Sequence, residues 1–498
     1  MKKNDLKQQG RPLTPEEAFL QKDKERARNN KIKNRPILVM TYAMVAVFVC
    51  LIGYIIYFTS FRAEIVIANS RNLRQDSFAD VVERGDIITS DGVVIATSTT
   101  DEEGNTYRSY PYSNMFAHVV GYESRGKSGL ELAGNFYMLR SHINIIERVY
   151  KELSEEKNRG DNVITTINYE LQNAAYNAMG SCNGAVVVLE PSTGKILCMI
   201  SKPDYNPNNM DAVWQYLDSE EGQTSSILLN RATQGLYAPG STFKVVTLLE
   251  YMRENPDYAD YNYTCNGSEI FYGVDIHCSG DRVHGNVTLG DSLAYSCNGS
   301  FATMGTSLDY GKYRETVDEL LFNSELPYDG VYSRSYFEIR KDSNDDELPQ
   351  TVIGQGNTQI TPLHNAMIFS AIANGGVLMR PYLIDKIEND DGVRVKKFHP
   401  SKYGSLMTSD EAAELTEYMK GVCTYGTASG YFSNCGYEVA GKTGTAEYDN
   451  NGNCNSWFVG FSNPDNPDLV VCVIMEDYSK YGITGASVAK SVFDAFYY

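Results

Sequence analysis

Three short motifs contain residue types that cooperate in nucleophilic catalysis. The first, Ser241-Thr242-Phe243-Lys244, places a lysine one helical turn after a serine, so both side chains would lie on one helix face. The second is Ser296-Cys297-Asn298, and the third is Lys442-Thr443-Gly444-Thr445. A serine at a helix N-terminus meets unpaired backbone N–H groups, and a nearby amine can accept its proton. The motifs therefore predict acyl transfer through a serine that is activated without histidine.

The Ser-x-x-Lys pattern is not specific by itself, because it occurs five times, starting at residues 124, 154, 192, 241 and 487. Pro239 and Gly240 predict a turn before Ser241, and the apolar residues that follow predict a buried helix. The copies at 124 and 192 contain a glycine in a loop or hairpin, and the copy at 154 is a polar helix end. No further motif follows the copy at 487 to complete a site. Context therefore selects Ser241 as the nucleophile.

The second and third motifs gain their value from order and context. Ser-Cys-Asn also occurs at residues 181–183, but that copy precedes Ser241 and opens a predicted strand. Lys-Thr-Gly occurs once, between the apolar pair Val439-Ala440 and a strand-like run at 457–461. We therefore expect the third motif on one strand of a pair.

Charge and hydropathy are distributed unevenly along the chain. The formal net charge of -19 argues against a nucleic-acid-binding protein. Residues 37–61 form an uncharged apolar run that is long enough to cross a bilayer. Eleven Lys/Arg and five Asp/Glu precede it, so we expect the N-terminus in the cytoplasm and the rest outside it. A cleaved signal peptide is the alternative, but the run and its basic lead are too long and no Ala-x-Ala site follows.

A chain of 498 residues is too long for one ordinary domain. We expect a flexible cytoplasmic tail over 1–36, a transmembrane helix over 37–61, a mixed α+β supporting module over 62–160 and a catalytic domain over 161–498. In the module, the Asp91-Gly92 turn predicts a hairpin, and residues 130–153 predict a helix or helix pair.

The catalytic region predicts an α/β fold in which a sheet is covered by helices. Strands are expected at 162–167, 184–190, 195–200, 438–440, 457–461 and 469–475. Helices are expected at 171–179, 361–374, 408–425 and 486–496, and they should dominate from 245 to about 325.

Cysteine and histidine spacing predicts no metal site and no cofactor. Cys50 lies in the apolar run, and the nine other cysteines form no dense framework, so most are expected to be buried thiols. Cys265 with Cys278, and Cys423 with Cys435, are close enough in sequence to close loops as disulfides. The six histidines form no ligand-spaced helical pair. His277, Cys278 and His284 come nearest to a metal site, and we expect His284 to order a loop instead.

The order Ser-x-x-Lys, Ser-x-Asn, Lys-Thr-Gly resembles that of the penicillin-binding proteins, and the chain resembles a class B member of that family. The resemblance covers most of the chain beyond the apolar run. It departs from the pattern at Cys297, where Asp is the usual residue, and at a glycine that is missing after Leu130-Glu131. Further matching segments are Arg84-Gly85 with Ile88 and Asp91-Gly92, Gly129-Leu130-Glu131, Tyr237-Ala-Pro-Gly240, Gly354-Gln355-Gly356 with Ile360-Thr361-Pro362-Leu363, and Ala373-Asn374-Gly375-Gly376.

The resemblance implies a peptidoglycan D,D-transpeptidase with an antiparallel sheet flanked by helices. Ser241 would attack the carbonyl of a D-Ala-D-Ala stem peptide, and a partly neutral Lys244 would accept its proton. Ser296 would relay that proton to the leaving amine. Asn298 would hold Lys244 and the substrate backbone.

The resemblance also assigns the residues that bind the substrate. Lys442 would lie near the terminal carboxylate, and Thr443 and Thr445 would offer hydroxyls. Gly444 would let the strand lie close to the ligand, because any side chain there would intrude. The oxyanion hole would be the backbone N–H groups of Ser241 and Thr445.

Several other activities share these motifs. A β-lactamase needs a placed base for deacylating water, and no convincing candidate is present. A D,D-carboxypeptidase differs only in the acceptor, so the modular architecture alone favours transpeptidation. A penicillin sensor or an inactive penicillin-binding scaffold is the non-enzymatic alternative. The resemblance further implies β-lactams as ligands and, as a partner, a glycan polymerase of the SEDS type, contacted through 37–61 and the supporting module. Whether the protein serves elongation, division or sporulation is left open.

Overall fold

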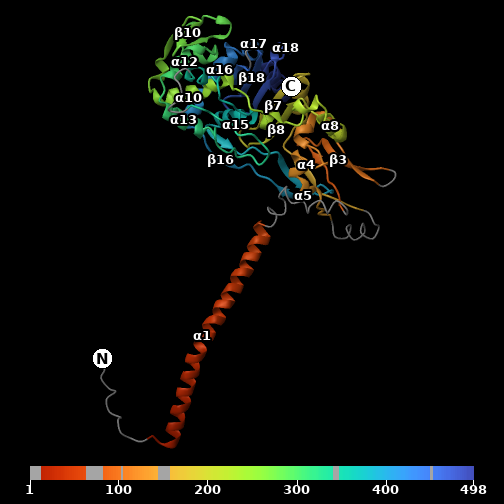
Figure 1. Ribbon diagram of the computed structural model, residues 1–498, viewed down its shortest axis with the longest axis vertical. Coiled ribbons are helices and arrows are strands. Elements are labelled where there is room, and N and C mark those ends of the chain that lie inside the picture. Colours follow the sequence, from red (N-terminus) through yellow and green to blue (C-terminus); the bar gives the residue numbers. More distant parts are fainter. Residues whose placement is uncertain (1–12, 63–81, 102–104, 144–156, 340–346, 449–452) are drawn as a thin grey trace, which may run out of the picture. The chain divides into compact units, whose positions relative to one another are not determined.

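The computed structural model describes residues 13–62, 82–101, 105–143, 157–339, 347–448 and 453–498. The chain divides into two units, residues 1–72 and residues 73–498. The first contains helix α1 (Pro15–Tyr57), which continues into the short π-helix η1 (Phe58–Arg62) (Figure 1). By length and composition α1 could cross a membrane, and none of its residues is buried.

The prediction of a flexible tail over 1–36 is wrong for the part that the structure describes, because α1 already begins at Pro15. Thr14 caps the helix, and its side chain and that of Glu17 form a capping box. Pro15 occupies the first turn, where its missing N–H has no cost. Residues 1–12 and the predicted stem at 63–80 lie outside the described residues.

The second unit contains a six-stranded sheet with the order β15-β14-β6-β2-β3-β4. The hairpin predicted around Asp91-Gly92 is confirmed, since β2 and β3 pair antiparallel on either side of it. Strand β6 pairs with β2 in parallel and with β14 antiparallel, so the sheet joins residues from both sides of position 160. The strands are β2 (Ile87–Ile88), β3 (Val94–Thr100), β4 (Thr106–Ser109), β6 (Asn162–Thr165), β14 (Ile384–Glu388) and β15 (Arg394–Lys397).

A buried ion-pair network fastens the short helices beside this sheet. The carboxylate of Glu131, which is fully buried, accepts from Arg84 Nε at 2.6 Å and from Arg108 Nε at 2.7 Å. Burial alone would raise the pKa of Glu131, but the two guanidinium groups hold it below its usual value. The helices are η3 (Ser113–Phe116), α3 (Ala117–Val120), α4 (Gly129–Ala133) and α5 (Asn135–Met138). The last two correspond to the start of the segment predicted at 130–153, of which 144–156 lie outside the described residues.

Replacing Glu131 with glutamine is expected to lower the free energy of unfolding by about 3–5 kcal/mol, because two buried guanidinium groups lose their counter-charge. Thermal unfolding of the purified protein measures this effect. Glu220→Gln is the matched control, because Glu220 is exposed, and it should change stability by less than about 0.5 kcal/mol. Equal melting temperatures for the two variants would contradict the assignment of Glu131 to a stabilising network.

The five-stranded sheet carries the third motif and is antiparallel throughout, with the order β17-β18-β19-β7-β8. Helix α15 packs on one face, and α7 and α19, which contact each other, pack on the other. Covering on both faces explains why β7 and β19 are buried along their whole length. The elements are β7 (Gly184–Leu189), β8 (Ile196–Lys202), β17 (Val439–Glu447), β18 (Cys454–Ser462), β19 (Val470–Met475), α7 (Tyr169–Ala178), α15 (Pro362–Ala373) and α19 (Gly485–Tyr497).

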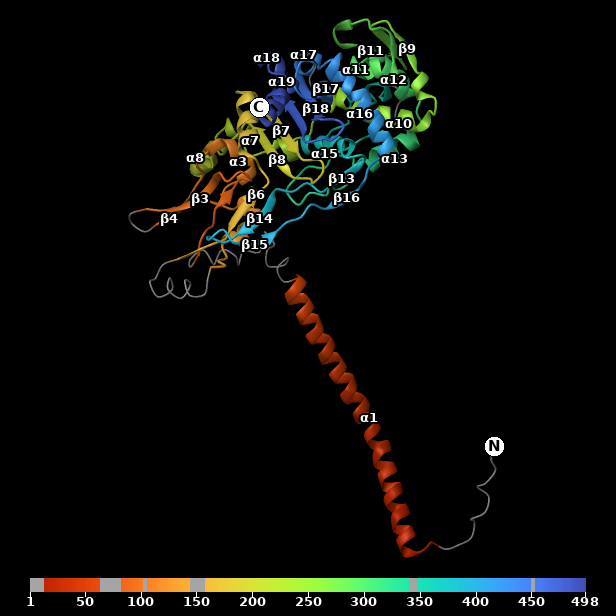
Figure 2. The same cartoon turned by 180° about the vertical axis from the view of Figure 1, so that it is seen from behind.

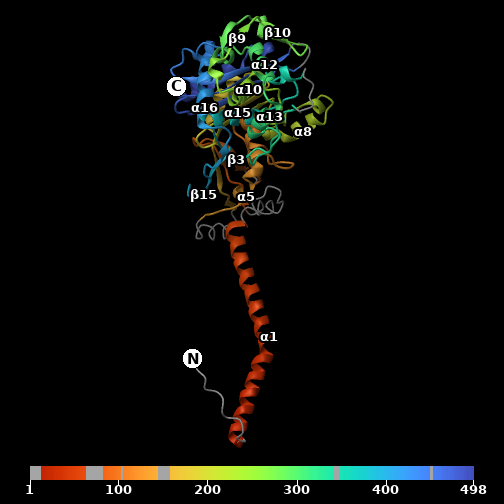
Figure 3. The ribbon, with the colours of Figure 1, turned by 90° about the vertical axis from the view of Figure 1, so that its left-hand side faces the viewer.

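A group of helices packs together beside this sheet (Figure 3). Its long members are α10 (Lys244–Glu254), α12 (Asn298–Thr306), α13 (Tyr310–Glu319) and α16 (Ser409–Thr424). Shorter elements of the unit are α8 (Met210–Leu217), α9 (Arg231–Gln234), α11 (Leu289–Ala294), α14 (Leu348–Thr351), α17 (Ser429–Phe432), α18 (Tyr478–Tyr481), β1 (Val82–Glu83), β5 (Asn158–Arg159), β13 (Val377–Met379) and β16 (Lys402–Ser405).

The prediction that helices dominate from 245 to about 325 is wrong between 262 and 288, where the chain forms two short hairpin-like pairs. The four strands expose most of their side chains, so the segment has no apolar period that would distinguish strand from helix. Figure 2 shows that this lobe and the six-stranded sheet lie at opposite ends of the second unit. The strands are β9 (Asn262–Cys265), β10 (Ser268–Phe271), β11 (Val274–His277) and β12 (Gly285–Thr288).

Candidate active site

Ser241 lies in the first helical turn of a segment that begins as the 3-10 helix η6 (Gly240–Phe243) and continues as α10. This agrees with the predicted turn and helix, except that the first turn is 3-10 in form. The turn lies against β17, and Gly240 has φ +52° there. A Cβ on Gly240 would approach Thr445 O to 2.6 Å, so only glycine fits. Trp457 Nε1 also donates to Ala238 O at 3.0 Å, which fixes the turn to the sheet.

Lys244 is fully buried at the start of α10, and its ammonium group points to the second motif. Its Nζ lies 2.5 Å from Asn298 Oδ1, 2.8 Å from Ser296 O and 3.1 Å from Ser296 Oγ. Burial lowers the pKa of Lys244 to about 8. A substantial fraction of this amine is therefore neutral near physiological pH and able to accept a proton.

Lys442 reaches the same hydroxyl from the sheet. It is fully buried on β17, and its Nζ lies 2.9 Å from Ser296 Oγ and 3.0 Å from Thr443 O. Burial and the repulsion of Lys244 lower the pKa of Lys442 well below its usual value. The Ser296 hydroxyl thus joins two amines that come from sequence positions far apart.

The backbone of the second motif is held in an unusual conformation. Ser296 has φ +57°, a left-handed value that is uncommon outside glycine. Cys297 follows as the N-terminal cap of α12, and Asn298 begins that helix. Asn298 Nδ2 donates to His277 O at 2.6 Å, so the lobe of β9 to β12 helps to orient the amide that meets Lys244.

The predicted substrate-binding residues lie along β17, the edge strand of the five-stranded sheet. Thr445 is exposed and Thr443 is half-buried. The structure explains the glycine at position 444 differently from the sequence, which predicted close approach of the strand to a ligand. A Cβ there would meet Trp457 Cβ at 3.0 Å and Thr242 Cγ2 at 3.1 Å, so glycine lets the strand approach the Ser241 turn.

Ser241 is the one predicted catalytic residue whose hydroxyl is not tied into the network. It is half-buried, and within the described part of the chain its Oγ forms no hydrogen bond. The three motifs nevertheless meet here, because Lys244 lies one turn from Ser241 and Thr445 adjoins Gly240.

Three polar residues of the site were not predicted from the sequence. Thr427 Oγ1 lies 2.6 Å from Thr443 Oγ1, Gln355 Nε2 donates to Thr445 O at 3.4 Å, and Asn365 Nδ2 donates to Thr242 Oγ1 at 3.2 Å. Gln355 lies in the Gly354-Gln355-Gly356 segment, which matches the family pattern, so the sequence contained a signal for this residue. Thr427 and Asn365 have no local pattern that would separate them from other polar residues.

Comparison with known proteins identifies the family of this chain. Residues 184–498 match the family model described as the penicillin binding protein transpeptidase domain. Residues 84–163 match the penicillin binding protein A dimerisation domain. The chain belongs to the class B penicillin-binding proteins. The resemblance and the fold class expected from the sequence are thereby confirmed.

Two curated class B relatives illustrate the similarity. The peptidoglycan D,D-transpeptidase PbpA of Mycolicibacterium smegmatis is 30% identical over 471 residues, which cover 87% of this chain and 92% of that protein. The peptidoglycan D,D-transpeptidase MrdA of Acinetobacter baumannii is 26% identical, over 81% of this chain and 67% of its own length.

Solved structures of penicillin-binding proteins have the same fold. The D,D-transpeptidase domain of a peptidoglycan glycosyltransferase from Eggerthella lenta aligns with TM-score 0.74 and 32% identity, covering 84% of this chain and 98% of that one. The imipenem acyl-enzyme of penicillin-binding protein A from Mycobacterium tuberculosis aligns with TM-score 0.73 and 28% identity, covering 83% and 99%.

Proposed function

We propose that this protein is a peptidoglycan D,D-transpeptidase that forms an acyl-enzyme on Ser241 and is acylated there by β-lactams. The observation that carries the proposal is the convergence of Lys244, Asn298 and Lys442 on the Ser296 segment beside Ser241. Two relatives carry the name D,D-transpeptidase, and a similar protein is described as an imipenem acyl-enzyme.

In the first half of the reaction, Ser241 Oγ attacks the carbonyl carbon of the penultimate D-Ala, and neutral Lys244 takes the hydroxyl proton. The C–N bond to the terminal D-Ala then breaks. Ser296 Oγ, which touches both Lys244 Nζ and Lys442 Nζ, passes a proton to the leaving amine. The products are an ester on Ser241 and free D-Ala.

The substrate is held by groups that become charged or polarised in this step. The backbone N–H of Ser241 lies in the first turn of η6, where N–H groups have no partner within the helix, and with that of Thr445 it forms the oxyanion hole. Lys442 attracts the terminal carboxylate, and the hydroxyls of Thr443 and Thr445 bind it. In the second half, the amine of another stem peptide attacks the ester, and the proton that it loses returns to Ser241.

The chain is anchored by residues 37–61, which lie in α1 and η1, with residues 1–36 in the cytoplasm and the catalytic domain outside it. The basic residues before the apolar run support this orientation. Residues 62–160 form the supporting module and residues 161–498 the transpeptidase domain, and the pairing of β2 with β6 joins them in one sheet. A glycan polymerase of the SEDS type is the partner, bound through the anchor and the module.

The acylation rate is expected to rise about tenfold per pH unit from pH 6 and to level off above about pH 8. Burial lowers the pKa of Lys244, so the neutral amine that accepts the Ser241 proton accumulates as pH increases through that value. Stopped-flow acylation by a chromogenic cephalosporin between pH 6 and 9.5 measures the profile. A rate that is independent of pH over this range would contradict Lys244 as the base.

Labelling with penicillin tests the proposed function directly. The intact mass of the purified full-length protein should increase by one bound penicillin, and peptide mapping should place the adduct on Ser241. Ser241→Ala should remain unlabelled. Ser192→Ala is the matched control, since Ser192 belongs to another Ser-x-x-Lys copy and is exposed, and it should label like the wild type. An unlabelled wild-type protein, or a labelled Ser241→Ala variant, would refute the proposal.

A further inference from the structure

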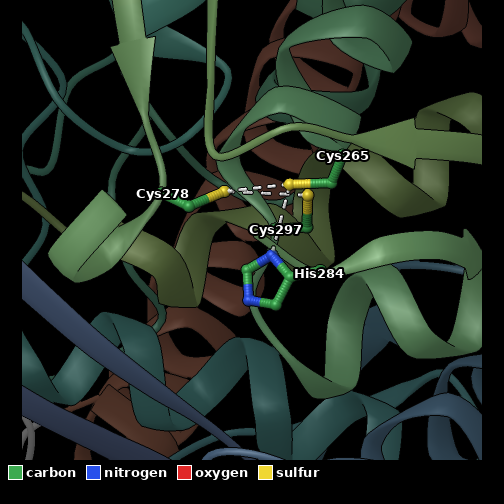
Figure 4. A group of neighbouring side chains, drawn as sticks. All are labelled: Cys265, Cys278, His284 and Cys297. Carbon is green, nitrogen blue, oxygen red and sulfur yellow. Dashed lines mark hydrogen bonds between the residues drawn. The ribbon is translucent and has the colours of Figure 1, made fainter. Parts of the chain in front are cut away.

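Three cysteines and one histidine gather beside the active site (Figure 4). Cys265 ends β9, Cys278 follows β11, His284 precedes β12, and Cys297 caps α12. Their ligand atoms all lie within 4.8 Å of one another. The three cysteines are buried and His284 is half-buried, so the cluster faces inward from four separate segments.

The distances between the sulfur and nitrogen atoms match the ligand spacing of a tetrahedral metal site better than the geometry of a disulfide. Cys278 Sγ lies 3.7 Å from Cys265 Sγ and 3.8 Å from Cys297 Sγ, and Cys265 Sγ lies 3.4 Å from His284 Nδ1. Around a tetrahedral zinc ion, with bonds of about 2.3 Å to sulfur and about 2.0 Å to nitrogen, neighbouring ligands are about 3.5–3.8 Å apart. A disulfide requires sulfur atoms about 2.05 Å apart. Cys265, Cys278 and Cys297 are free thiols, and so are Cys423 and Cys435, the other pair that the sequence offered as a disulfide.

The lobe that carries three of the ligands buries few side chains of its own. Each of β9, β11 and β12 buries a single residue, and β10 buries none. The three cysteines form a small apolar cluster of their own, against which Tyr263 packs. Small lobes with so few buried side chains commonly depend on a metal or a disulfide for stability.

We propose that Cys265, Cys278, His284 and Cys297 bind a structural Zn²⁺ ion. Thiolate and imidazole are the ligands that zinc prefers, and four protein ligands leave no open position for catalysis. On binding, each thiol loses its proton to solvent. The proposal replaces the sequence-based expectation of no metal site and of a loop-ordering role for His284. The sequence indicated Cys278 and His284 as the nearest approach to a metal site and Cys265 as a possible disulfide partner of Cys278, whereas Cys297 comes from a position that only the fold brings near.

The proposed site would position the second catalytic motif. Cys297 is the residue between Ser296 and Asn298, and Asn298 Nδ2 donates to the carbonyl of His277, the neighbour of Cys278. A bound ion would therefore fix both ends of the Asn298 contact and hold Ser296 at its left-handed φ. This consequence rests on the proposed function, whereas the ion binding itself does not.

Metal analysis of the full-length protein tests the site. After incubation with Zn²⁺ under reducing conditions and desalting, the wild type should retain about one zinc ion per chain. Cys265→Ser and His284→Ala should each weaken binding at least about tenfold in competition with a chromophoric chelator. The matched controls are Cys435→Ser and His399→Ala, which lie outside the cluster and should bind like the wild type.

Cobalt substitution of the wild type requires no variant and so remains decisive if a variant fails to fold. Co²⁺ should give the visible absorption of a tetrahedral site together with a thiolate charge-transfer band. A wild type that retains no metal, zinc retained equally by Cys265→Ser and His284→Ala, or a Cys265–Cys278 disulfide in protein whose thiols are trapped at lysis would overturn the proposal.

The effect on the active site is measured separately. His284→Ala should acylate about tenfold more slowly than His399→Ala, because Ser296 and Asn298 lose their support. Ser241→Ala should bind zinc normally while it fails to acylate, so failure of the metal site and failure of the proposed function give different results. Equal acylation rates for the two histidine variants would overturn the positioning role.

Discussion

Replacing Lys244 with alanine is expected to lower the rate of Ser241 acylation about 10³-fold, the usual range for loss of a positioned general base. The side chain is fully buried, and Asn298 Oδ1 and two oxygens of Ser296 surround its Nζ. Alanine removes the proton acceptor and also leaves these oxygens without their donor. Water entering the space would be a poor substitute, because it lacks a pKa close to 8.

The rate of acylation by a labelled penicillin at pH 8 measures this loss. Lys490→Ala is the matched control, because Lys490 ends another Ser-x-x-Lys copy that is also helical and forms an ion pair with Asp494 on α19. Its rate should equal that of the wild type. A Lys244→Ala variant that is folded and acylates within threefold of the wild type would show that another group takes the proton.

Replacing Lys442 with alanine is expected to lower acylation about 10²-fold, since it removes the amine that becomes protonated beside the substrate carboxylate and attracts it. The loss should depend on the substrate. A donor peptide analogue whose terminal carboxylate is replaced by an amide should react equally with the variant and the wild type.

Steady-state kinetics with the carboxylate and amide forms of a thioester donor separate these effects. The ratio of kcat/KM between the two forms should be about 10² in the wild type and near one in Lys442→Ala. Lys480→Ala serves as control, because Lys480 is an exposed lysine of the same unit. If Lys442→Ala slows both substrates equally, the charge of Lys442 acts on the fold or on Lys244 and not on the substrate.

The sequence predicted those elements whose signals are local. The helices expected at 171–179 and 361–374 are present as α7 and α15, which Asn168 and Thr361 cap, and the buried strands around the third motif have the apolar composition of a covered sheet. The start of α10 was predicted from Pro239 and Gly240, although it takes a 3-10 form. Recognition of three ordered motifs then identified residues that lie far apart in sequence and meet in the fold.

The features that the sequence did not reveal depend on tertiary contacts. The lobe of β9 to β12 has short strands with exposed side chains, so its pattern fits neither regular element. Gly444 was predicted to face a ligand, but its missing Cβ faces Thr242 and Trp457, which no spacing could indicate. Cys297 likewise becomes a neighbour of Cys278 only when α12 packs beside the lobe.

Transfer of the acyl group to an amine distinguishes a transpeptidase from a hydrolase, and the reaction products report which of the two occurs. The purified full-length protein is given a thioester analogue of the donor stem peptide with a D-amino acid as acceptor, and products are separated by liquid chromatography and mass spectrometry. We expect the wild type to form an amide between donor and acceptor, and Ser241→Ala to form none. Hydrolysed donor alone, at every acceptor concentration, would contradict a transpeptidase and would instead indicate a D,D-carboxypeptidase.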